Sequence, residues 1–269
     1  MYDIIIVGAG TAGLTAAIYG VRAGKSVLVL EAKTYGGQII NTPKIENYPG
    51  IKEISGFEYA KNLYEQAKDL GAKVHFEQVT AIETTESGKL VKTTKDSYEC
   101  RSVILATGAK NRPLSLPREQ ELIGAGVSYC ATCDGMLYRG KRAAVIGLAA
   151  DAPAEADFLR EIGCDVQYYD GKKHRFEIRG AERADTLVVD GAAQPADVIF
   201  VLRAGFAADT LLPGIATEKG HIVVDESYAA SIPGVFAAGD CTGSPYQIPA
   251  AVGEGNRAAL SVVRWLRNA

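Results

Sequence analysis

The segment from Gly8 to Gly13 constrains the fold of this 269-residue chain more than any other feature. Its sequence is Gly-Ala-Gly-Thr-Ala-Gly; a short apolar run over 3–7 precedes it, and an alanine-rich stretch over 14–23 follows it. A second apolar run over 26–30 then ends in Glu31. Strand, glycine turn, helix and second strand form the fingerprint of a dinucleotide-binding unit. The glycines and the helix start face the pyrophosphate, and the acid faces the ribose. We therefore predict a Rossmann-like unit here.

Length and composition narrow the class of protein further. A chain of 269 residues favours two domains, and 47% hydrophobic residues with 29 glycines are typical of an α/β protein. The formal net charge of −3 and the lack of a long basic run argue against nucleic acid as a partner. No apolar run reaches the roughly 18 residues of a membrane span, so we expect no membrane partner.

A pair of cysteines separated by two residues, Cys130 and Cys133, lies in the middle of the chain. Thiol–disulfide exchange requires a thiolate attacker and a stabilised leaving sulfur. Two cysteines at a helix start provide both, because first-turn amides stabilise a thiolate. The alternative, half of a zinc site, lacks a second such pair or neighbouring histidines, so we predict no metal. The remaining cysteines, at 100, 164 and 241, are expected to be ordinary core or turn residues in a reducing cytoplasm.

Two later segments resemble the flavin site of a known family. Ser102–Gly108 and Gly234–Asp240 are apolar strands that end in small residues, the second with an acid. With the N-terminal fingerprint, they closely resemble the two-dinucleotide flavoprotein disulfide reductases, in which such segments hold FAD. The motifs Gly36-Gly37-Gln38 and Glu46-Asn47-Tyr48-Pro49-Gly50 narrow this resemblance, over nearly the whole chain, to the low-molecular-weight thioredoxin reductases.

The resemblance assigns site residues. Asp240 matches the aspartate that binds the ribityl chain of FAD. The full set expected to contact FAD is Gly8, Gly10, Thr11, Ala12, Gly13, Glu31, Ala32, Gly37, Gln38, Asn47, Ala106, Thr107, Gly108, Gly239, Asp240, Gln247 and Ile248.

The same resemblance assigns catalytic roles to Cys130, Cys133 and Asp134. It favours Cys133 as the cysteine that meets the flavin, and Asp134 as the acid that protonates the leaving thiolate; a helix-capping aspartate is the structural alternative. The larger flavoprotein disulfide reductases, of the glutathione-reductase type, have their redox cysteines in the first domain and a catalytic histidine near the C-terminus. Here the region 36–50 has no cysteine, and the three histidines lie far from such a position. We therefore expect acid–base chemistry without histidine.

A second nucleotide-binding scaffold is predicted around the dithiol, with strands over 142–146, 165–169 and 197–202 and a helix over 151–162. Where the family has a glycine run, this chain reads Gly147-Leu148-Ala149-Ala150-Asp151. Side chains then occupy the place of bare backbone, and Asp151, as a helix cap with Pro153 in the first turn, would repel phosphate.

Three further departures from the family pattern point the same way. The family's His-Arg-Arg cluster is replaced by Asp170-Gly171-Lys172, and its C-terminal Arg-Gln pair by Tyr246-Gln247. The stretch over 175–196 is also shorter than in the family. These departures predict loss of tight NADPH binding.

The predicted architecture is α/β, with two Rossmann-like domains, the second shortened and inserted into the first. Residues 1–112 and 206–269 would form the FAD-binding domain, and residues 113–205 the dithiol domain. The crossings at Arg112-Pro113 and Arg203-Ala204-Gly205 would allow rotation. We expect an antiparallel appendage over 73–99 and a final helix over 253–265 that starts against the flavin. By resemblance, the protein would be a homodimer through the FAD domain.

Together these features predict an FAD-dependent thioredoxin reductase that takes electrons from a ferredoxin-type donor and passes them through the Cys130–Cys133 dithiol to thioredoxin. It resembles the ferredoxin-dependent flavin thioredoxin reductases, which lack the nucleotide motifs. The alternatives are a conventional NAD(P)H enzyme with degenerate motifs and a flavin redox sensor without turnover. A basic face for an acidic ferredoxin would come from Arg139, Lys141, Arg142, Lys172, Lys173 and Arg175.

Overall fold

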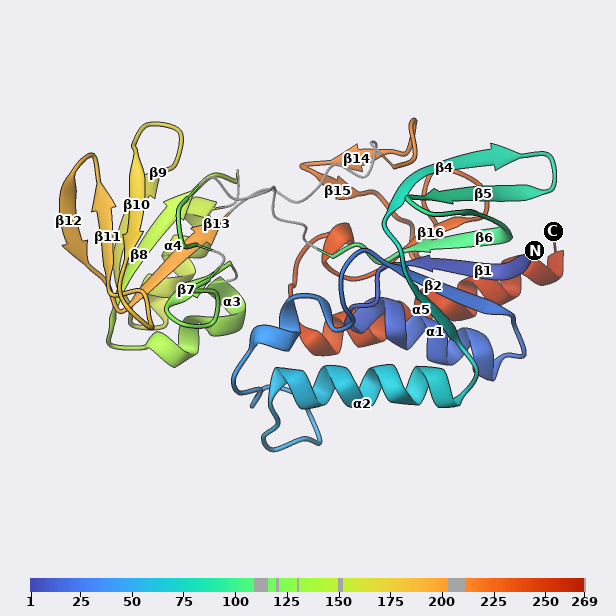
Figure 1. Ribbon diagram of the computed structural model, residues 1–269, viewed down its shortest axis with the longest axis horizontal. Coiled ribbons are helices and arrows are strands. Elements are labelled where there is room, and N and C mark those ends of the chain that lie inside the picture. The colour runs from blue at the N-terminus through green and yellow to red at the C-terminus, as the bar shows by residue number, and fades with distance from the viewer. Residues whose placement is uncertain (109–115, 120, 130, 150–151, 203–210, 269) are drawn as a thin grey trace. The chain divides into compact units, whose positions relative to one another are not determined.

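The computed structural model describes residues 1–108, 116–119, 121–129, 131–149, 152–202 and 211–268. The chain divides into two compact units, Met1–Lys110 with Phe206–Ala269, and Asn111–Gly205 (Figure 1). Each unit has its own sheets. Their assignment as an FAD-binding and a dithiol domain stays a prediction, and the predicted crossings at 112–113 and 203–205 lie outside the described residues.

The first unit is built on a seven-stranded sheet in the order β3-β2-β1-β6-β5-β4, with β16 paired to β6. Strands β3, β2, β1, β6 and β16 run parallel. Their bounds are β1 Tyr2–Val7, β2 Val27–Glu31, β3 Lys73–Phe76, β6 Ser97–Leu105 and β16 Val235–Ala237. The antiparallel strands are β4 Val79–Thr85 and β5 Gly88–Thr93. A small separate hairpin pairs β14 Thr217–Glu218 with β15 His221–Ile222. The predicted strand, glycine turn, helix and second strand are confirmed.

The expectation of an antiparallel appendage over 73–99 is correct only in part. Strand β3 pairs in parallel with β2, with Val74 opposite Val29, and so extends the parallel sheet. The chain between these strands contains helix α2, Gly56–Asp69, and a helical crossover returns the chain in the same direction. Only β4 and β5 are antiparallel additions, beside the first half of β6.

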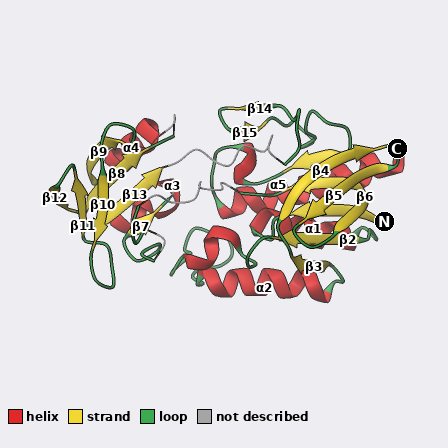
Figure 2. Cartoon of the chain, turned by 45° about the horizontal axis from the view of Figure 1, so that its top comes forward, coloured by secondary structure: helices red, strands yellow, loops and turns green. Residues whose placement is uncertain are grey.

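Both faces of the parallel sheet are buried. On one face, Ile4, Ile6 and Val29 pack against helices α1, Thr11–Arg22, and α5, Ile248–Asn268. On the other face, alternate residues such as Ile5 and Leu28 join a second core with side chains of β4, β5 and the segment 211–222. Figure 2 shows α1, α2 and α5 on one side of this sheet and β4 and β5 curving over the other. Strands that are buried on both faces account for the nearly continuous apolar runs in the sequence.

The last helix begins earlier than predicted. It starts at Ile248 rather than at Gly253 and runs for 21 residues. Gly253 and Gly255 are therefore interior positions of the helix. Glycine at position 255 permits a close helix contact, because an added Cβ there would collide with the carbonyl oxygen of Ala12 in α1.

The second unit has a four-stranded parallel sheet in the order β7-β13-β8-β9 and a three-stranded antiparallel sheet. The predicted strands over 142–146, 165–169 and 197–202 are confirmed as β8, β9 and β13. Helix α4 is described from Ala152, because Asp151 and its proposed cap lie outside the described residues. The bounds are β7 Val127–Ser128, α3 Ala131–Asp134, η2 Gly135–Tyr138, β8 Arg142–Gly147, α4 Ala152–Glu161, β9 Asp165–Asp170, β10 Phe176–Arg179, β11 Thr186–Val189, β12 Ala192–Pro195 and β13 Val198–Leu202.

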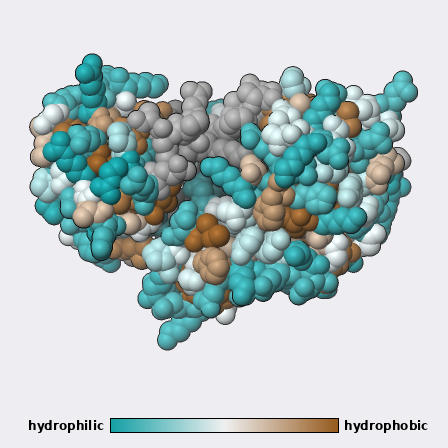
Figure 3. All heavy atoms as spheres, viewed as in Figure 1, coloured by the Kyte–Doolittle hydropathy of each residue, from teal (hydrophilic) through white to brown (hydrophobic). Residues whose placement is uncertain are grey.

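The drawn face of each unit is mostly hydrophilic, with hydrophobic residues in small groups (Figure 3). Within the part of the chain that the structure describes, no helix combines the length and the apolar character of a membrane span. Helix α5 has the length, but its charged residues include Glu254, Arg257 and Arg264.

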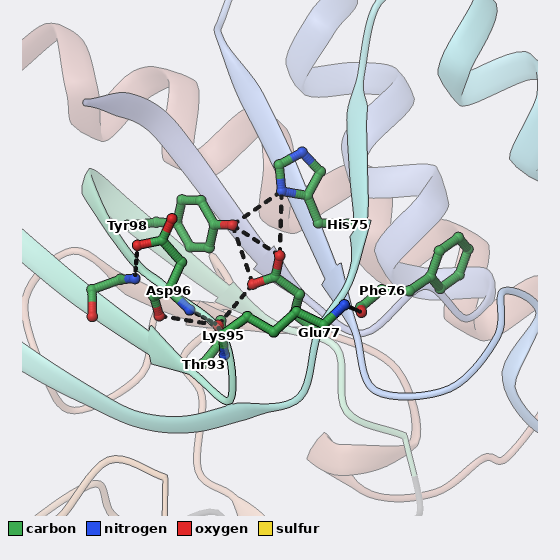
Figure 4. Close-up of polar contacts among 8 residues, drawn as sticks. His75, Phe76, Glu77, Thr93, Lys95, Asp96 and Tyr98 are labelled. Carbon is green, nitrogen blue, oxygen red and sulfur yellow. Dashed lines mark hydrogen bonds and ion pairs between the residues drawn. The ribbon is translucent and has the colours of Figure 1, made fainter.

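A polar cluster around Glu77 joins the β3–β4 connection to the β5–β6 turn (Figure 4). The Glu77 carboxylate accepts hydrogen bonds from the Tyr98 hydroxyl at 3.0 Å and from the Thr93 hydroxyl at 2.7 Å. The His75 ring nitrogen lies 3.2 Å from the same Tyr98 oxygen. Burial and the Glu77 carboxylate raise the pKa of Tyr98 to about 12. The phenol therefore stays a hydrogen-bond donor at physiological pH.

Replacing Tyr98 with Phe removes the donor to Glu77 and keeps the ring. We expect the free energy of unfolding to fall by about 1–2 kcal/mol, because a hydrogen bond to a charged acceptor is lost. Urea unfolding of the wild type and the variant measures this change. Tyr64→Phe is the matched control, since that ring stacks on Tyr35 and the structure shows no hydrogen bond from its hydroxyl among the described residues. Equal losses in both variants would contradict the role of the cluster.

Candidate functional site

The glycine turn after β1 brings three chain segments into close contact. Gly8 has φ +110°, and an added Cβ there would collide with the carbonyl oxygen of Ala106 at the end of β6. An added Cβ at Gly13 would collide with the Gly8 carbonyl oxygen. These two glycines therefore hold α1 against the carboxyl ends of β1 and β6, as the fingerprint requires.

Gly10 has a different role from its two neighbours. An added Cβ at Gly10 would meet no atom within 4 Å, so the space in front of the turn is open. Gly10 is also the N-cap of α1, and it has no side chain with which to cap the helix. The first-turn amides of Thr11, Ala12 and Gly13 can then bind a phosphate oxygen. Gly37 borders the same space, with its added Cβ 3.5 Å from Gly10 Cα.

Glu31 lies where the fingerprint predicts an acid for the ribose. One of its oxygens accepts a hydrogen bond from the Ala9 amide at 2.9 Å, and the other accepts one from the Lys33 amide at 3.0 Å. The carboxylate is thus held against the glycine turn, at the end of β2 and beside Ala32. Local backbone amides fix its position, and no side chain among the described residues pairs with it.

The start of α5 adds a second group of predicted FAD residues to the same unit. Asn47 donates a side-chain hydrogen bond of 3.0 Å to Gln247, which directly precedes Ile248, the first residue of α5. Gln38 lies in the short helix η1, Gly37–Asn41, next to the glycine turn. The Ala106 amide donates to the Val7 carbonyl, and Thr107 and Gly108 follow directly. The fold therefore gathers residues from four distant parts of the sequence.

Asp240 begins the short helix η4, Asp240–Thr242, after a sharp turn at Gly239 with φ +82°. Burial, and next the nearby Glu254 carboxylate, raise the pKa of Asp240 to about 6. The sequence reasoning missed Glu254, although an acid between two glycines in a helix was a visible signal. Glu254 accepts hydrogen bonds from the Gly239 amide at 2.7 Å and from the Thr242 hydroxyl at 3.2 Å.

These residues fit FAD. The open space at Gly10, the uncapped helix start and the acid at Glu31 match a pyrophosphate joined to a ribose. All the predicted FAD residues belong to the first unit, and their individual contacts with the cofactor stay predictions.

Asp134 lies at the end of α3 in the second unit. The Ser128 hydroxyl donates to it at 2.7 Å, and burial raises the pKa of its carboxyl. Asp134 stands at the N-cap position of η2 but makes no side-chain capping hydrogen bond there. The capping alternative is therefore wrong for this side chain, and a buried carboxyl with a raised pKa suits proton donation. Cys130 and the side chain of Cys133 lie outside the described residues.

The start of α3 differs from the expectation in one contact. We expected first-turn amides to stabilise a thiolate, but the Ala131 amide donates to the Glu155 carboxylate of α4 at 3.2 Å. The expectation is therefore wrong for this amide. The Glu155 carboxylate occupies this donor, so only later amides of the helix are candidates for stabilising a thiolate.

The three remaining cysteines are free and buried, as predicted. Burial raises the pKa of all three thiols, to about 12 for Cys100 and about 11 for Cys241. They are therefore poor nucleophiles. Among the described residues, no group of three or more His, Cys, Asp or Glu side chains is placed to hold a metal ion.

In the described part of the second glycine block, the chain itself contacts the backbone amides and the glycines. The amides of Leu148 and Ala149 both donate to the Leu202 carbonyl of β13, at 2.7 and 3.0 Å. An added Cβ at Gly147 would collide with the Tyr168 hydroxyl, and one at Gly171 would collide with the Leu148 side chain. The amides of Leu148 and Ala149 are thus bonded to protein, and side chains pack around Gly147 and Gly171; Ala150 and Asp151 lie outside the described residues.

The residues that replace the family's phosphate clamp are also engaged. Asp170 accepts a hydrogen bond from the Lys172 amide and pairs with Lys173 at 3.0 Å; the amide first and then the side chain lower the pKa of Asp170. A half-buried, ionised carboxylate at this strand end disfavours a 2′-phosphate.

One histidine lies closer to the predicted flavin residues than the sequence suggested. His221 of β15 is 2.8 Å from the Tyr246 hydroxyl, and Tyr246 precedes Gln247. The contact joins residues 25 positions apart, so no local pattern indicated it. His174 instead contacts Asp190 at 2.7 Å, and His75 belongs to the Glu77 cluster.

Comparisons with known proteins agree with this geometry. The model of the pyridine nucleotide-disulphide oxidoreductase family matches residues 2–182 and 172–255. A thioredoxin reductase of Treponema pallidum is 35% identical and covers 98% of this chain and 97% of its own length.

Two solved structures are similar over the whole chain. The thioredoxin reductase of Streptococcus pyogenes has a TM-score of 0.87 at 32% identity and covers 100% of this chain and 99% of its own. A ferredoxin-flavin thioredoxin reductase from Clostridium acetobutylicum has a TM-score of 0.63 at 33% identity, with 99% and 98% covered. The fold class and the FAD cofactor predicted from the sequence are confirmed. The chain therefore belongs to the pyridine nucleotide-disulphide oxidoreductase family and, within it, to the FAD-dependent thioredoxin reductases.

Proposed function

We propose that this thioredoxin reductase takes its electrons from a ferredoxin-type protein and not from a pyridine nucleotide. FAD would pass two electrons to the Cys130–Cys133 disulfide, and the dithiol that results would reduce the disulfide of thioredoxin. The observation that carries the proposal is the closed second glycine block, in which Leu202 accepts the amides of Leu148 and Ala149. A protein donor requires a surface but no nucleotide pocket.

The two glycine blocks of the chain provide an internal comparison. At the first, the position of Gly10 is open and the helix start is uncapped. At the second, Leu148 and Ala149 carry side chains and their amides donate to Leu202, and the positions that correspond to Thr11 and Ala12 lie outside the described residues. A buried amide that already has a partner gains nothing from a phosphate, because one hydrogen bond would only replace another. The same chain thus keeps one dinucleotide site and lacks the features of another.

The relatives support the family and leave the donor open. The matched structures include a ferredoxin-flavin thioredoxin reductase as well as enzymes titled only thioredoxin reductase. The alignment with the Treponema relative extends over 302 positions, more than the 269 residues of this chain. The relative therefore has residues that this chain lacks, in agreement with a shortened domain.

The predicted basic face is weaker than the sequence suggested. Arg142 pairs with Asp197 through two of its side-chain nitrogens, and Lys173 pairs with Asp170. Lys141 lies over the Tyr138 ring. Ion pairing therefore neutralises two of the six positive charges of the predicted face. Exposed charges are screened over about 8 Å at physiological ionic strength. We expect added salt to slow the reduction of the flavin by ferredoxin only moderately.

The dithiol unit also presents apolar side chains suited to a protein substrate. Met136 and Leu137 directly follow the dithiol helix and are 58% and 41% exposed. Exposed apolar residues beside a reactive group are typical of a protein-binding surface. We place the thioredoxin contact there.

One hollow on the surface of the first unit supports a homodimer in which the first units of two copies are in contact. It has a volume of about 420 Å³ and is lined by α1, α2 and the segment 48–54, including Ile18, Tyr19, Ile51 and Leu63. The Thr15 hydroxyl at its floor is buried without a hydrogen bond among the described residues. A second copy would cover this apolar surface. Sedimentation equilibrium tests the proposal, and a single species of 28.5 kDa would contradict it.

The buried free thiols of Cys100, Cys164 and Cys241 are compatible with the reducing cytoplasm that we propose as the location.

FAD, when bound, accepts electrons singly and returns them in pairs. The residues of this chain bind the cofactor, keep phosphate out of the second unit and supply a proton from Asp134.

The donor is tested by anaerobic reduction of the bound flavin, followed by its absorbance. We expect reduced ferredoxin to bleach the flavin within the turnover time, because it needs no nucleotide pocket. NADPH and NADH at matched electron supply should leave the flavin oxidised on that timescale. Rapid bleaching by NADPH with none by ferredoxin would overturn the proposal.

Asp134→Asn should slow thioredoxin reduction by about 10²-fold or more and leave flavin reduction unchanged, because the amide cannot donate a proton to the leaving thiolate. In the wild type, this step should slow as pH rises through the raised pKa of Asp134, since the acid is then lost. Stopped-flow measurement gives the rate at which the dithiol reduces thioredoxin. Cys130→Ser, which should not react, provides the background rate.

Asp157→Asn in α4 is the matched control, because this aspartate is exposed and pairs only locally, with Arg160. If Asp134→Asn and Asp157→Asn both react at the wild-type rate, Asp134 is not the acid.

A further inference from the structure

Glu254 connects helix α5 to the turn that carries Asp240. One of its oxygens accepts both the Gly239 amide, at 2.7 Å, and the Thr242 hydroxyl, at 3.2 Å. These two donors flank Asp240 in the sequence. The single Thr242 hydroxyl hydrogen is shared between Glu254 and the Gly239 carbonyl, which lies 2.9 Å from the same oxygen. A single carboxylate therefore holds both ends of the turn.

The backbone around this turn leaves little freedom. Gly239 has φ +82°, a conformation that favours glycine, and its added Cβ would lie 2.8 Å from the Ala12 side chain. Gly255, next to Glu254, packs against the Ala12 carbonyl. The start of α1, the turn and α5 thus meet at one point. A carboxylate in α5 is in this way fixed relative to the pyrophosphate end of the predicted FAD site.

Asp240 also lies among other titratable and charged groups. Helix α5 contributes Glu254 and, one turn further, Arg257, which lies over the Tyr228 ring. The segment before β16 contributes Tyr228, and η4 contributes Cys241. Strand β15 packs against η4 and contributes His221. Of these groups, the Glu254 carboxylate is the one that disfavours ionisation of Asp240 by like charge.

We propose that Glu254 is a positioning residue of the flavin site: it holds the Gly239–Thr242 turn in place and makes FAD binding release a proton from Asp240 to solvent. The inference rests on the assignment of Asp240 to the ribityl chain. A carboxylate that accepts hydrogen bonds from ribityl hydroxyls is bound in its ionised form. In the flavin-free protein, Glu254 opposes that ionisation. Binding then converts a neutral Asp240 into a carboxylate, and one proton leaves.

The sign of the pH dependence follows directly. The FAD association constant should rise with pH by up to about tenfold per unit below the pKa of Asp240 in the flavin-free protein and level off above it. Burial and Glu254 set that pKa to about 6. The folding stability of the flavin-free protein has the opposite pH dependence. The stabilisation linked to neutral Asp240 is complete below the unfolded value of 3.8 and is lost as pH rises through about 6.

The experiment is a titration of the flavin-free protein with FAD, followed by flavin fluorescence, from pH 5 to 8. Glu254→Gln keeps an oxygen that accepts the Gly239 amide and removes the charge, so the step in affinity should move to lower pH. Asp240→Asn should show no step. Glu86→Gln, an exposed change in the β4–β5 turn, should keep the wild-type profile. Thermal unfolding of the flavin-free variants against pH provides a second readout.

Each outcome discriminates between accounts. A wild-type affinity that is flat from pH 5 to 8, or a Glu254→Gln profile identical to the wild type, would overturn the role of Glu254. Loss of the step in His221→Gln with retention in Glu254→Gln would also overturn it and assign the titration to His221. A protein that binds no FAD at any pH would instead refute the flavin-site assignment itself.

Discussion

The close approach of the backbone at Gly8 and Gly13 is the constraint on which the first unit depends. Both positions exclude a Cβ, because the carbonyl oxygens of Ala106 and Gly8 occupy that space. The contact fixes α1 over the carboxyl ends of two neighbouring parallel strands. Its uncapped first turn then faces the open space at Gly10. The acids at the ends of β2 and β16 are placed by this same arrangement.

The second unit has a similar arrangement of parallel strands and a helix. The turn after β8, which corresponds to the glycine turn after β1, makes different contacts. Its parallel strands and α4 follow the predicted order. The turn after β8, however, donates its amides to Leu202 and packs Leu148 on Gly171. The core of this unit depends on apolar strands and a nucleotide site depends on free amides, so a core of this kind can exist without such a site. This unit retains the dithiol and the buried Asp134.

Local sequence patterns predicted the elements well and the long-range contacts poorly. The apolar run, glycine turn and helix after Tyr2 lie within 22 residues, so their pattern was sufficient. The contact of Glu254 with Gly239, by contrast, depends on where α5 begins, and that start was predicted five residues late. The sequence prediction for the second site rested on the side chains of Leu148 and Ala149 and on Asp151. The structure adds a contact that no local motif could indicate: the Leu202 carbonyl, more than 50 positions away, accepts the amides of Leu148 and Ala149.

The central claim is that the chain has one dinucleotide site and not two. Calorimetric titration of the FAD-loaded protein with NADPH, in the absence of oxygen and of thioredoxin, measures this most directly. We predict no saturable heat up to millimolar NADPH, since the amides of Leu148 and Ala149 donate to Leu202 and the Leu148 side chain packs on Gly171. Saturable binding of one NADPH per chain with a micromolar dissociation constant would contradict the account.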